Sequence, residues 1–215
     1  MNCKNELLKF DLEVEEISNS KIERNKVFYQ ESLSQTYSVS LFFDEKSTAE
    51  LLDFILKVAQ ITKNDYVVKN NIPPHITLGM FKATKNQEWQ LVEIIQKFNS
   101  EFQPIFEKKE NVLCFEKLDI LKNKIAFLSF AANQSIIFEL NQKLHNSLLP
   151  DFPAACNNLY LPQVFFPHCT VATGLSKTHL ALLQDVQNKN QMKIPKFVHV
   201  SKISLAIRHP YQELF

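Results

Sequence analysis

The chain has 215 residues, 45% of them hydrophobic, and 24 Lys and Arg residues nearly balance 23 Asp and Glu residues, for a formal net charge of +1. This balance argues against a protein dedicated to long duplex DNA or RNA, which needs a basic face, and leaves smaller ligands open. No stretch approaches the roughly 18 to 20 uninterrupted apolar residues of a membrane span, and the first residues lack the apolar segment of a signal peptide. We therefore expect a cytoplasmic protein with no membrane partner.

The small number of glycines and the wide spacing of the cysteines exclude further classes of binding site. The two glycines, Gly79 and Gly174, cannot build the Gly-rich phosphate loop of a P-loop or dinucleotide-binding protein. The four cysteines contain neither a CxxC pair nor a dense framework, so we interpret them as reduced thiols rather than as disulfides or a zinc site. They are Cys3, Cys114, Cys156 and Cys169. We predict no cofactor and expect the chain to act as a monomer.

The first half of the chain alternates strand and helix patterns. Residues 35–43 alternate small polar and large apolar side chains, the period of a strand with one buried face. Ser47 opens a capping-box pattern that predicts a helix ending near residue 60. Residues 74–81 then read as a strand, and 87–102 as a helix that ends before Pro104. The apolar side of this helix would carry Trp89, Val92, Ile95 and Phe98.

The second half repeats this order after an additional strand. We predict strands over 111–115 and 124–130, a helix over 135–148, a strand over 165–172, a helix capped by Ser176 and a last strand over 197–207. Each half therefore contains strand, helix, strand and helix in that order. Residues 1–34 stand outside the repeat as an extension whose role the sequence does not define.

A His-x-Thr tripeptide occurs in the second strand of each repeat. His75-Ile76-Thr77 and His168-Cys169-Thr170 each follow a proline. In a strand, residues i and i+2 share a face, so each His and its Thr point the same way while the middle residue points into the core. Cys169 is accordingly expected to be a small core residue and not a nucleophile. If the halves pack about a pseudo-twofold axis, two imidazoles and two hydroxyls converge in one cleft.

Such a cleft suits a phosphodiester. One neutral imidazole can take a proton, the other, protonated, can give one to a departing oxygen, and Thr hydroxyls can donate to non-bridging phosphate oxygens. Taken singly, a strand His is usually structural and a strand Thr reflects β-propensity, so the inference depends on the duplication. No Asp, Glu or Cys accompanies either His on the cleft face, and we predict no metal site.

From about Tyr37 to Ile207 the chain resembles the 2H phosphoesterase superfamily, whose two His-hydrophobic-Thr-hydrophobic motifs correspond to residues 75–78 and 168–171. Within that superfamily it is most similar to the 2′-5′ RNA ligase and RNA 2′,3′-cyclic phosphodiesterase group. The resemblance implies an α+β fold with two pseudo-symmetric lobes and antiparallel sheets around a central cleft. One domain would then span residues 35–215, with halves of about 35–103 and 104–215 between which a strand can be exchanged.

The resemblance also implies an activity and its residues. The activity is metal-independent opening of 2′,3′-cyclic phosphate RNA ends or small cyclic nucleotides, with 2′-5′ joining as a reverse-sense reaction in some members. His75 and His168 would form the acid and base pair, and Thr77 and Thr170 would bind the phosphate. The second motif departs from the common pattern at Cys169, where a bulkier aliphatic residue is usual.

Four further residues are weaker candidates for substrate contact. Phe81 and Phe166 fall on the face of the catalytic pairs by strand alternation and could stack a base, although a core role is the more common one for Phe. Tyr160 lies in a long loop before the second motif, and such loops are often functional. Arg208 follows the last strand, where a phosphate contact is conceivable and a solvated strand end is the ordinary reading.

Competing functions share the same residues. A linear 2′-5′ oligonucleotide, an ADP-ribose-type cyclic phosphate or a 3′ RNA tail could replace the cyclic RNA end as substrate. The rival of a different class is a non-catalytic nucleotide or RNA-binding module that keeps the cleft for phosphate recognition. Two intact proton-transfer groups weigh against that module, because binding alone does not need them.

Overall fold

A computed structural model describes residues 34–108, 112–122, 124–131, 134–155, 159–189, 192–207 and 211–215. The predicted extension therefore lies almost wholly outside the described residues. The elements are β1 (Ser34–Phe43), α2 (Glu45–Thr62), α3 (Tyr66–Lys69), β2 (His75–Thr84), a 3-10 turn (Lys85–Gln87), α4 (Glu88–Phe106), β3 (Val112–Leu121), β4 (Ile125–Phe130), α5 (Ser135–Leu148), β5 (His168–Thr173), α6 (Lys177–Asn188), β6 (Phe197–Ile207) and β7 (Gln212–Glu213). The α+β class is confirmed.

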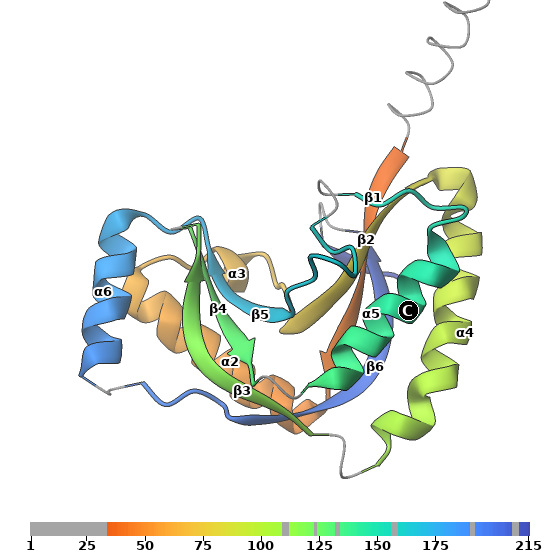
Figure 1. The fold of residues 1–215 in the computed structure, drawn as a ribbon. Helices are drawn as coiled ribbons and strands as arrows, with labels where there is room; N and C mark the ends of the chain where they lie inside the picture. The colour runs from red at the N-terminus through yellow and green to blue at the C-terminus, as the bar shows by residue number, and fades with distance from the viewer. Residues whose placement is uncertain are drawn as a thin grey trace, which may run out of the picture.

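One antiparallel sheet joins the seven strands in the order β1-β2-β5-β4-β3-β6-β7, with β1 also paired to β6 (Figure 1). The long strand β6 connects the part of the sheet that contains β3 with the part that contains β1. Its first residues pair with β3, where His199 faces Val112, and its remainder pairs with β1, where Ile207 faces Tyr37. At the other junction, β2 meets β5 in the pair Ile76 and Cys169. The antiparallel arrangement is thus present, but as one continuous sheet rather than as two separate ones.

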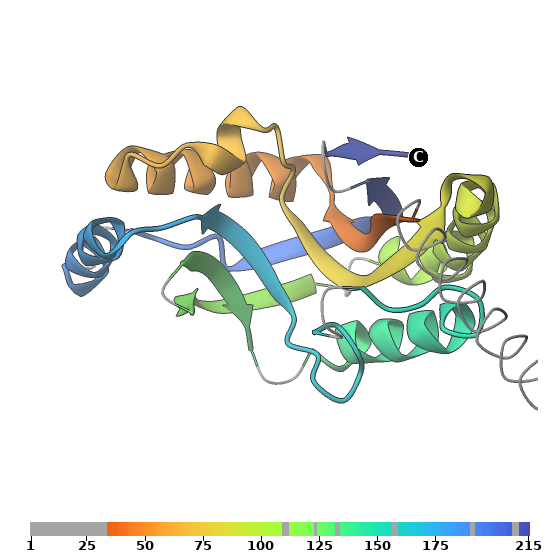
Figure 2. The same cartoon turned by 90° about the horizontal axis from the view of Figure 1, so that it is seen from above.

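The two halves of the chain exchange helices as well as a strand. Helix α2, from the first half, packs against β5 and α6, and helix α5, from the second half, packs against β2. Helix α4 packs against β6. Figure 2 shows α2 and α6 toward one end of the molecule and α4 and α5 toward the other. The lobes therefore do not follow the boundary near residue 103, since each half contributes elements to both.

Two helix predictions need correction at their ends. Helix α2 starts before Ser47, because Asp44 is the N-cap and its Oδ1 accepts a hydrogen bond of 2.8 Å from the Ser47 backbone N–H. Helix α4 continues through Pro104 to Phe106. Proline removes one backbone donor, and near the end of a helix this loss is outweighed by burial of Phe102 and Phe106 on the same face.

The buried side of α4 also differs from the prediction. It consists of Leu91, Ile95, Phe98, Phe102 and Phe106. Trp89 is 62% exposed, because the helical stripe that starts at Leu91 turns position 89 outward.

None of the helices in the described part of the chain is both long and apolar enough to cross a membrane.

Gly79 lies on β2 where a side chain has no room, and its substitution tests the packing there. A Cβ at this position would come within 2.6 Å of the Phe81 ring and 3.2 Å of the His145 ring. Both rings are buried, so we expect Gly79→Ala to lower the free energy of unfolding by about 1 to 3 kcal/mol in urea denaturation. Adding Phe81→Leu should recover part of the loss, and strictly additive effects of the two substitutions would contradict this explanation.

Candidate functional site

A cavity of about 560 Å³ is lined by residues of β1, β2, β4 and β5 and of the segments beside them. The four motif residues His75, Thr77, His168 and Thr170 all line it. The other lining residues are Ser38, Asn64, Tyr66, Val67, Asn70, Ile72, Met80, Ile125, Tyr160, Thr173, Gly174 and Tyr211. Its volume is in the range of pockets that hold small organic ligands, and is larger than a phosphate group alone requires.

The convergence of the motifs follows from the junction of β2 with β5. Ile76 pairs with Cys169, and both side chains are fully buried. Because neighbouring strand residues point to opposite faces, the His and Thr on either side of each middle residue face the cavity. The antiparallel direction brings each His toward the Thr of the other motif.

A β-bulge after Thr77 decides which residue continues the cavity wall on β2. Thr77 and Gly79 pair with consecutive residues of β1, which leaves Leu78 as an extra residue. One extra residue reverses the faces of the residues that follow, so Met80 lines the cavity. Phe81 is fully buried and packs against the His145 ring at 5.1 Å. The prediction that Phe81 contacts substrate, which assumed an unbroken alternation, is therefore wrong.

The second motif strand has the equivalent bulge. Thr170 and Ala172 pair with consecutive residues of β4, which leaves Val171 as the extra residue. Thr173 consequently lines the cavity at the position that Met80 has on β2, three residues beyond the motif Thr. The pseudo-symmetry of the two halves thus extends to the backbone irregularity that shapes the site.

Both motif imidazoles are held in the same way. Nδ1 of His75 lies 2.8 Å from the carbonyl oxygen of Pro73, and Nδ1 of His168 lies 2.8 Å from that of Phe166. A carbonyl can only accept, so Nδ1 carries the proton in each neutral ring and Nε2 carries the lone pair. In both motifs, Nε2 is therefore the nitrogen that exchanges protons with a ligand.

Partial burial favours the neutral form of the His168 imidazole. Desolvation lowers its pKa below the ordinary histidine value, and the hydrogen bond to the Phe166 carbonyl opposes this in part. The ring lies 5.4 Å from that of Phe127 and is stacked against Phe166 at 6.1 Å. His168 is thus held as a neutral imidazole at neutral pH.

Cys169 has the role that strand alternation predicts. Its side chain is fully buried, and burial raises the pKa of the thiol to about 12. A thiol with this pKa remains protonated under physiological conditions, and only the thiolate is strongly nucleophilic. Cys169 therefore packs the core behind the site.

The other sequence candidates lie in different places. Tyr160 lines the cavity. Phe166 is 51% exposed beside His168, where its ring contacts that imidazole. Arg208 falls outside the described residues. Substrate contact by Tyr160 and Phe166 stays a prediction.

Sequence reasoning missed part of the cavity wall. Asn64, Tyr66 and Asn70 come from the segment between α2 and β2, and Tyr211 comes from the segment before β7. The side-chain amide of Asn64 donates to the Thr173 carbonyl at 3.2 Å, which ties this segment to the second motif strand. No motif marks these residues, because their positions depend on contacts between segments that are distant in sequence.

Asn141 of α5 supports the site from the core. It is 1% exposed, and its Nδ2 donates to the Leu78 carbonyl at 2.6 Å and to the Tyr160 carbonyl at 2.8 Å. One amide group thus holds both the β2 bulge and the loop that carries Tyr160. Within the described ranges, no group of three or more His, Cys, Asp or Glu side chains is placed to hold a metal ion.

Comparison with known proteins finds structural neighbours but no sequence match. No protein-family model matches the chain, and no curated protein matches its sequence. The crystal structure of the MHV ns2 PDE domain is 15% identical, with a TM-score of 0.46 over 84% of this chain and 99% of that chain. The structure of Kluyveromyces marxianus Usb1 is 9% identical, with a TM-score of 0.42 over 85% of this chain and 97% of that chain.

Replacement of Asn141 by Asp tests its two hydrogen bonds. The new carboxyl oxygen would face two carbonyl oxygens in the core, so we expect Asn141→Asp to lower the free energy of unfolding by about 2 to 4 kcal/mol. Asn146→Asp, on the exposed side of the same helix, should change it by less than about 0.5 kcal/mol. Equal stability of the two variants in urea denaturation would show that the Asn141 contacts contribute little.

Proposed function

We propose that the chain is a metal-independent phosphoesterase that opens 2′,3′-cyclic phosphate ends of RNA or small cyclic nucleotides. The supporting observation is that two imidazoles and two hydroxyls from the duplicated motifs line one cavity, with both imidazoles held through Nδ1. Proton transfer at two sites and donation to phosphate oxygens are what cleavage of a phosphodiester requires. The resemblance of the motifs to those of 2H phosphoesterases agrees with this assignment.

In the proposed reaction, Nε2 of one imidazole takes a proton from water as the water oxygen forms a bond to phosphorus. The bond from phosphorus to one ribose oxygen breaks, and the other imidazole, protonated at the start, gives its Nε2 proton to that oxygen. The product is a nucleotide with a terminal phosphate monoester. Thr77 and Thr170 donate hydrogen bonds to non-bridging oxygens as negative charge increases on them.

The partial burial of His168 supports its assignment as the base. A base must be neutral before the reaction, and the lowered pKa of His168 keeps its imidazole neutral at pH 7. His75 then acts as the acid.

The same four residues would serve four alternatives: a linear 2′-5′ oligonucleotide, a 3′ RNA tail or an ADP-ribose-type cyclic phosphate as substrate, and the 2′-5′ joining reaction. The non-catalytic binding module remains the alternative of another class.

A cleavage assay in EDTA tests the assignment. The substrate is a short RNA that ends in a 2′,3′-cyclic phosphate, and we expect the wild type to open it. His75→Ala and His168→Ala should each reduce kcat by at least about 100-fold, the usual contribution of general acid or base catalysis. His179→Ala, in the first turn of α6 and outside the cavity lining, serves as the matched control and should keep full activity.

The outcomes of this assay separate the alternatives. Loss of activity in EDTA would contradict a metal-free mechanism. Binding of the RNA without opening would favour the binding module, or one of the other phosphodiester substrates. Activity that survives loss of either imidazole would remove that residue from the acid and base pair.

The pH dependence of kcat/KM tests the role of His168. Because the base must be neutral and its pKa is lowered, activity should fall with decreasing pH only below about 6.5, the ordinary histidine value. Phe166→Ala exposes the ring and should move this acid limb to higher pH. Phe138→Ala removes another exposed ring that packs on Phe165 and should leave the limb in place. An acid limb that Phe166→Ala does not move would contradict the assignment.

A further inference from the structure

The two ends of the cavity differ in chemistry. Strands β2 and β5 are antiparallel, so the residues that follow their bulges, Met80 and Thr173, lie toward opposite ends. Thr173 is accompanied by the Asn64 amide, which donates to its carbonyl. Met80 is a thioether and pairs across the sheet with Ser38 of β1. The framework is duplicated, but the two ends offer different surfaces to a ligand.

Two tyrosines line the end of the cavity at which Met80 lies, which we call the Met80 end. The Tyr160 carbonyl shares the Asn141 amide with the carbonyl of Leu78, the bulge residue two positions before Met80. Tyr211 directly precedes β7, which pairs with the same part of β6 that pairs with Ser38. Both tyrosines line the cavity. Of the three tyrosines that line the cavity, Tyr160 and Tyr211 therefore lie at the Met80 end, whereas Tyr66 of α3 lies on the side of Thr173 and Asn64.

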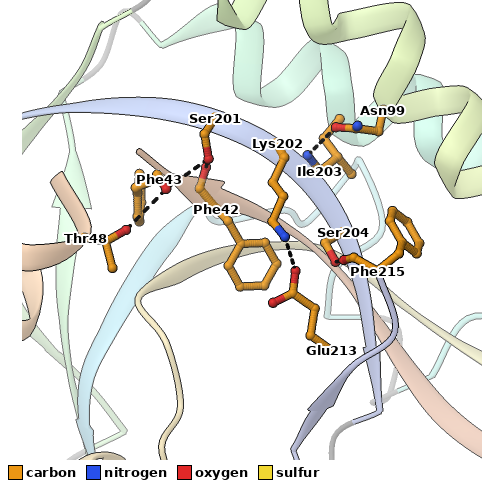
Figure 3. A network of polar contacts seen from close by, with 10 residues as sticks. All are labelled: Phe42, Phe43, Thr48, Asn99, Ser201, Lys202, Ile203, Ser204, Glu213 and Phe215. Carbon is orange, nitrogen blue, oxygen red and sulfur yellow. Dashed lines mark hydrogen bonds and ion pairs between the residues drawn. The ribbon is translucent and has the colours of Figure 1, made fainter. Parts of the chain in front are cut away.

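Residues 211–215, which we call the C-terminal strap, are firmly attached just after Tyr211. Glu213 pairs with Ala206, and the Leu214 N–H donates to the Leu205 carbonyl at 2.8 Å. Figure 3 shows the side-chain contacts, in which Lys202 forms an ion pair of 2.5 Å with Glu213 and the Ser204 hydroxyl donates to the Phe215 carbonyl. These contacts fix the strap on β6, so the ring of Tyr211 is pre-positioned in the cavity wall.

Building on the proposed function, we propose that the Met80 end is a nucleoside subsite in which a base of the RNA stacks on the Tyr211 ring, beside Tyr160. A phosphate held by the motif residues occupies only the middle of a cavity of about 560 Å³, and the remaining volume must hold the groups attached to it. Stacking on an aromatic ring suits any base, because every base has a flat π face. Tyr211 is thereby a substrate-binding residue of the strap.

The Tyr211 hydroxyl supplies a clean control. It is buried and has no hydrogen-bond partner within the described part of the chain. Tyr211→Phe therefore keeps the ring without breaking a hydrogen bond, and Tyr211→Leu keeps a large apolar side chain without an aromatic face. The two variants differ in stacking ability while both fill the same wall.

The test measures, by calorimetry, the binding of two probes to the full chain. Inorganic phosphate reports on the motif residues alone. A 2′-deoxy dinucleoside monophosphate carries a nucleoside on each side of its phosphate, so one nucleoside must lie toward the Met80 end. We expect Tyr211→Leu to weaken dinucleoside binding by about tenfold, within the usual range for loss of one stacked base, and Tyr211→Phe to weaken it by less than about threefold. Phosphate binding should stay within about twofold in both.

Failure of this proposal is distinct from failure of the proposed function. If the wild type binds neither probe, the phosphate site itself is contradicted. If the wild type binds both probes and Tyr211→Leu binds the dinucleoside as tightly as Tyr211→Phe does, the phosphate site stands and the stacking subsite is overturned. Equal weakening of phosphate and dinucleoside in Tyr211→Leu would also overturn it, since the effect would then come from the motif residues.

Discussion

The pairing of Ile76 with Cys169 is the contact on which the rest of the site depends. It places the middle residues of the two motifs opposite each other in the core, and strand geometry then turns two imidazoles and two hydroxyls to the same side. Shifting either strand by one residue would turn its His and Thr into the core. The large apolar side chains around this junction therefore fix the polar site as well as the fold.

The duplication of the motif strands explains the features that the two sides of the cavity share, but not the differences between its two ends. Both motif strands carry a bulge directly after the Thr, and both imidazoles donate from Nδ1 to the carbonyl two residues earlier. The halves diverge beyond these shared features, where one end has Met80 and the strap and the other has Thr173 and the amides near α3. A symmetric centre for the phosphate is thus combined with unlike ends, which can distinguish the two sides of a substrate.

Local sequence patterns predicted the features of the structure that depend on local backbone geometry and on the spacing of apolar residues. Strand alternation and helical spacing gave helix α5 and strand β6 with their observed bounds, and alternation placed Ile76 and Cys169 in the core. Phe81 was misplaced because a bulge has no reliable sequence signal in a strand that otherwise alternates well. Tyr211 and the exchange of α2 and α5 between lobes could not be predicted, because they follow from packing between distant segments.

The central claim is that His75 and His168 address one phosphate through Nε2. Nitrogen NMR of the histidine side chains, during titration with a nucleoside 3′-monophosphate, tests it most directly. We predict that both rings carry the proton on Nδ1 when neutral, and that their Nε2 signals shift together with a single dissociation constant. The buried His145, which bonds to the Asn141 carbonyl behind the site, should not shift. A shift of only one motif histidine, or different dissociation constants for the two, would contradict a shared phosphate site.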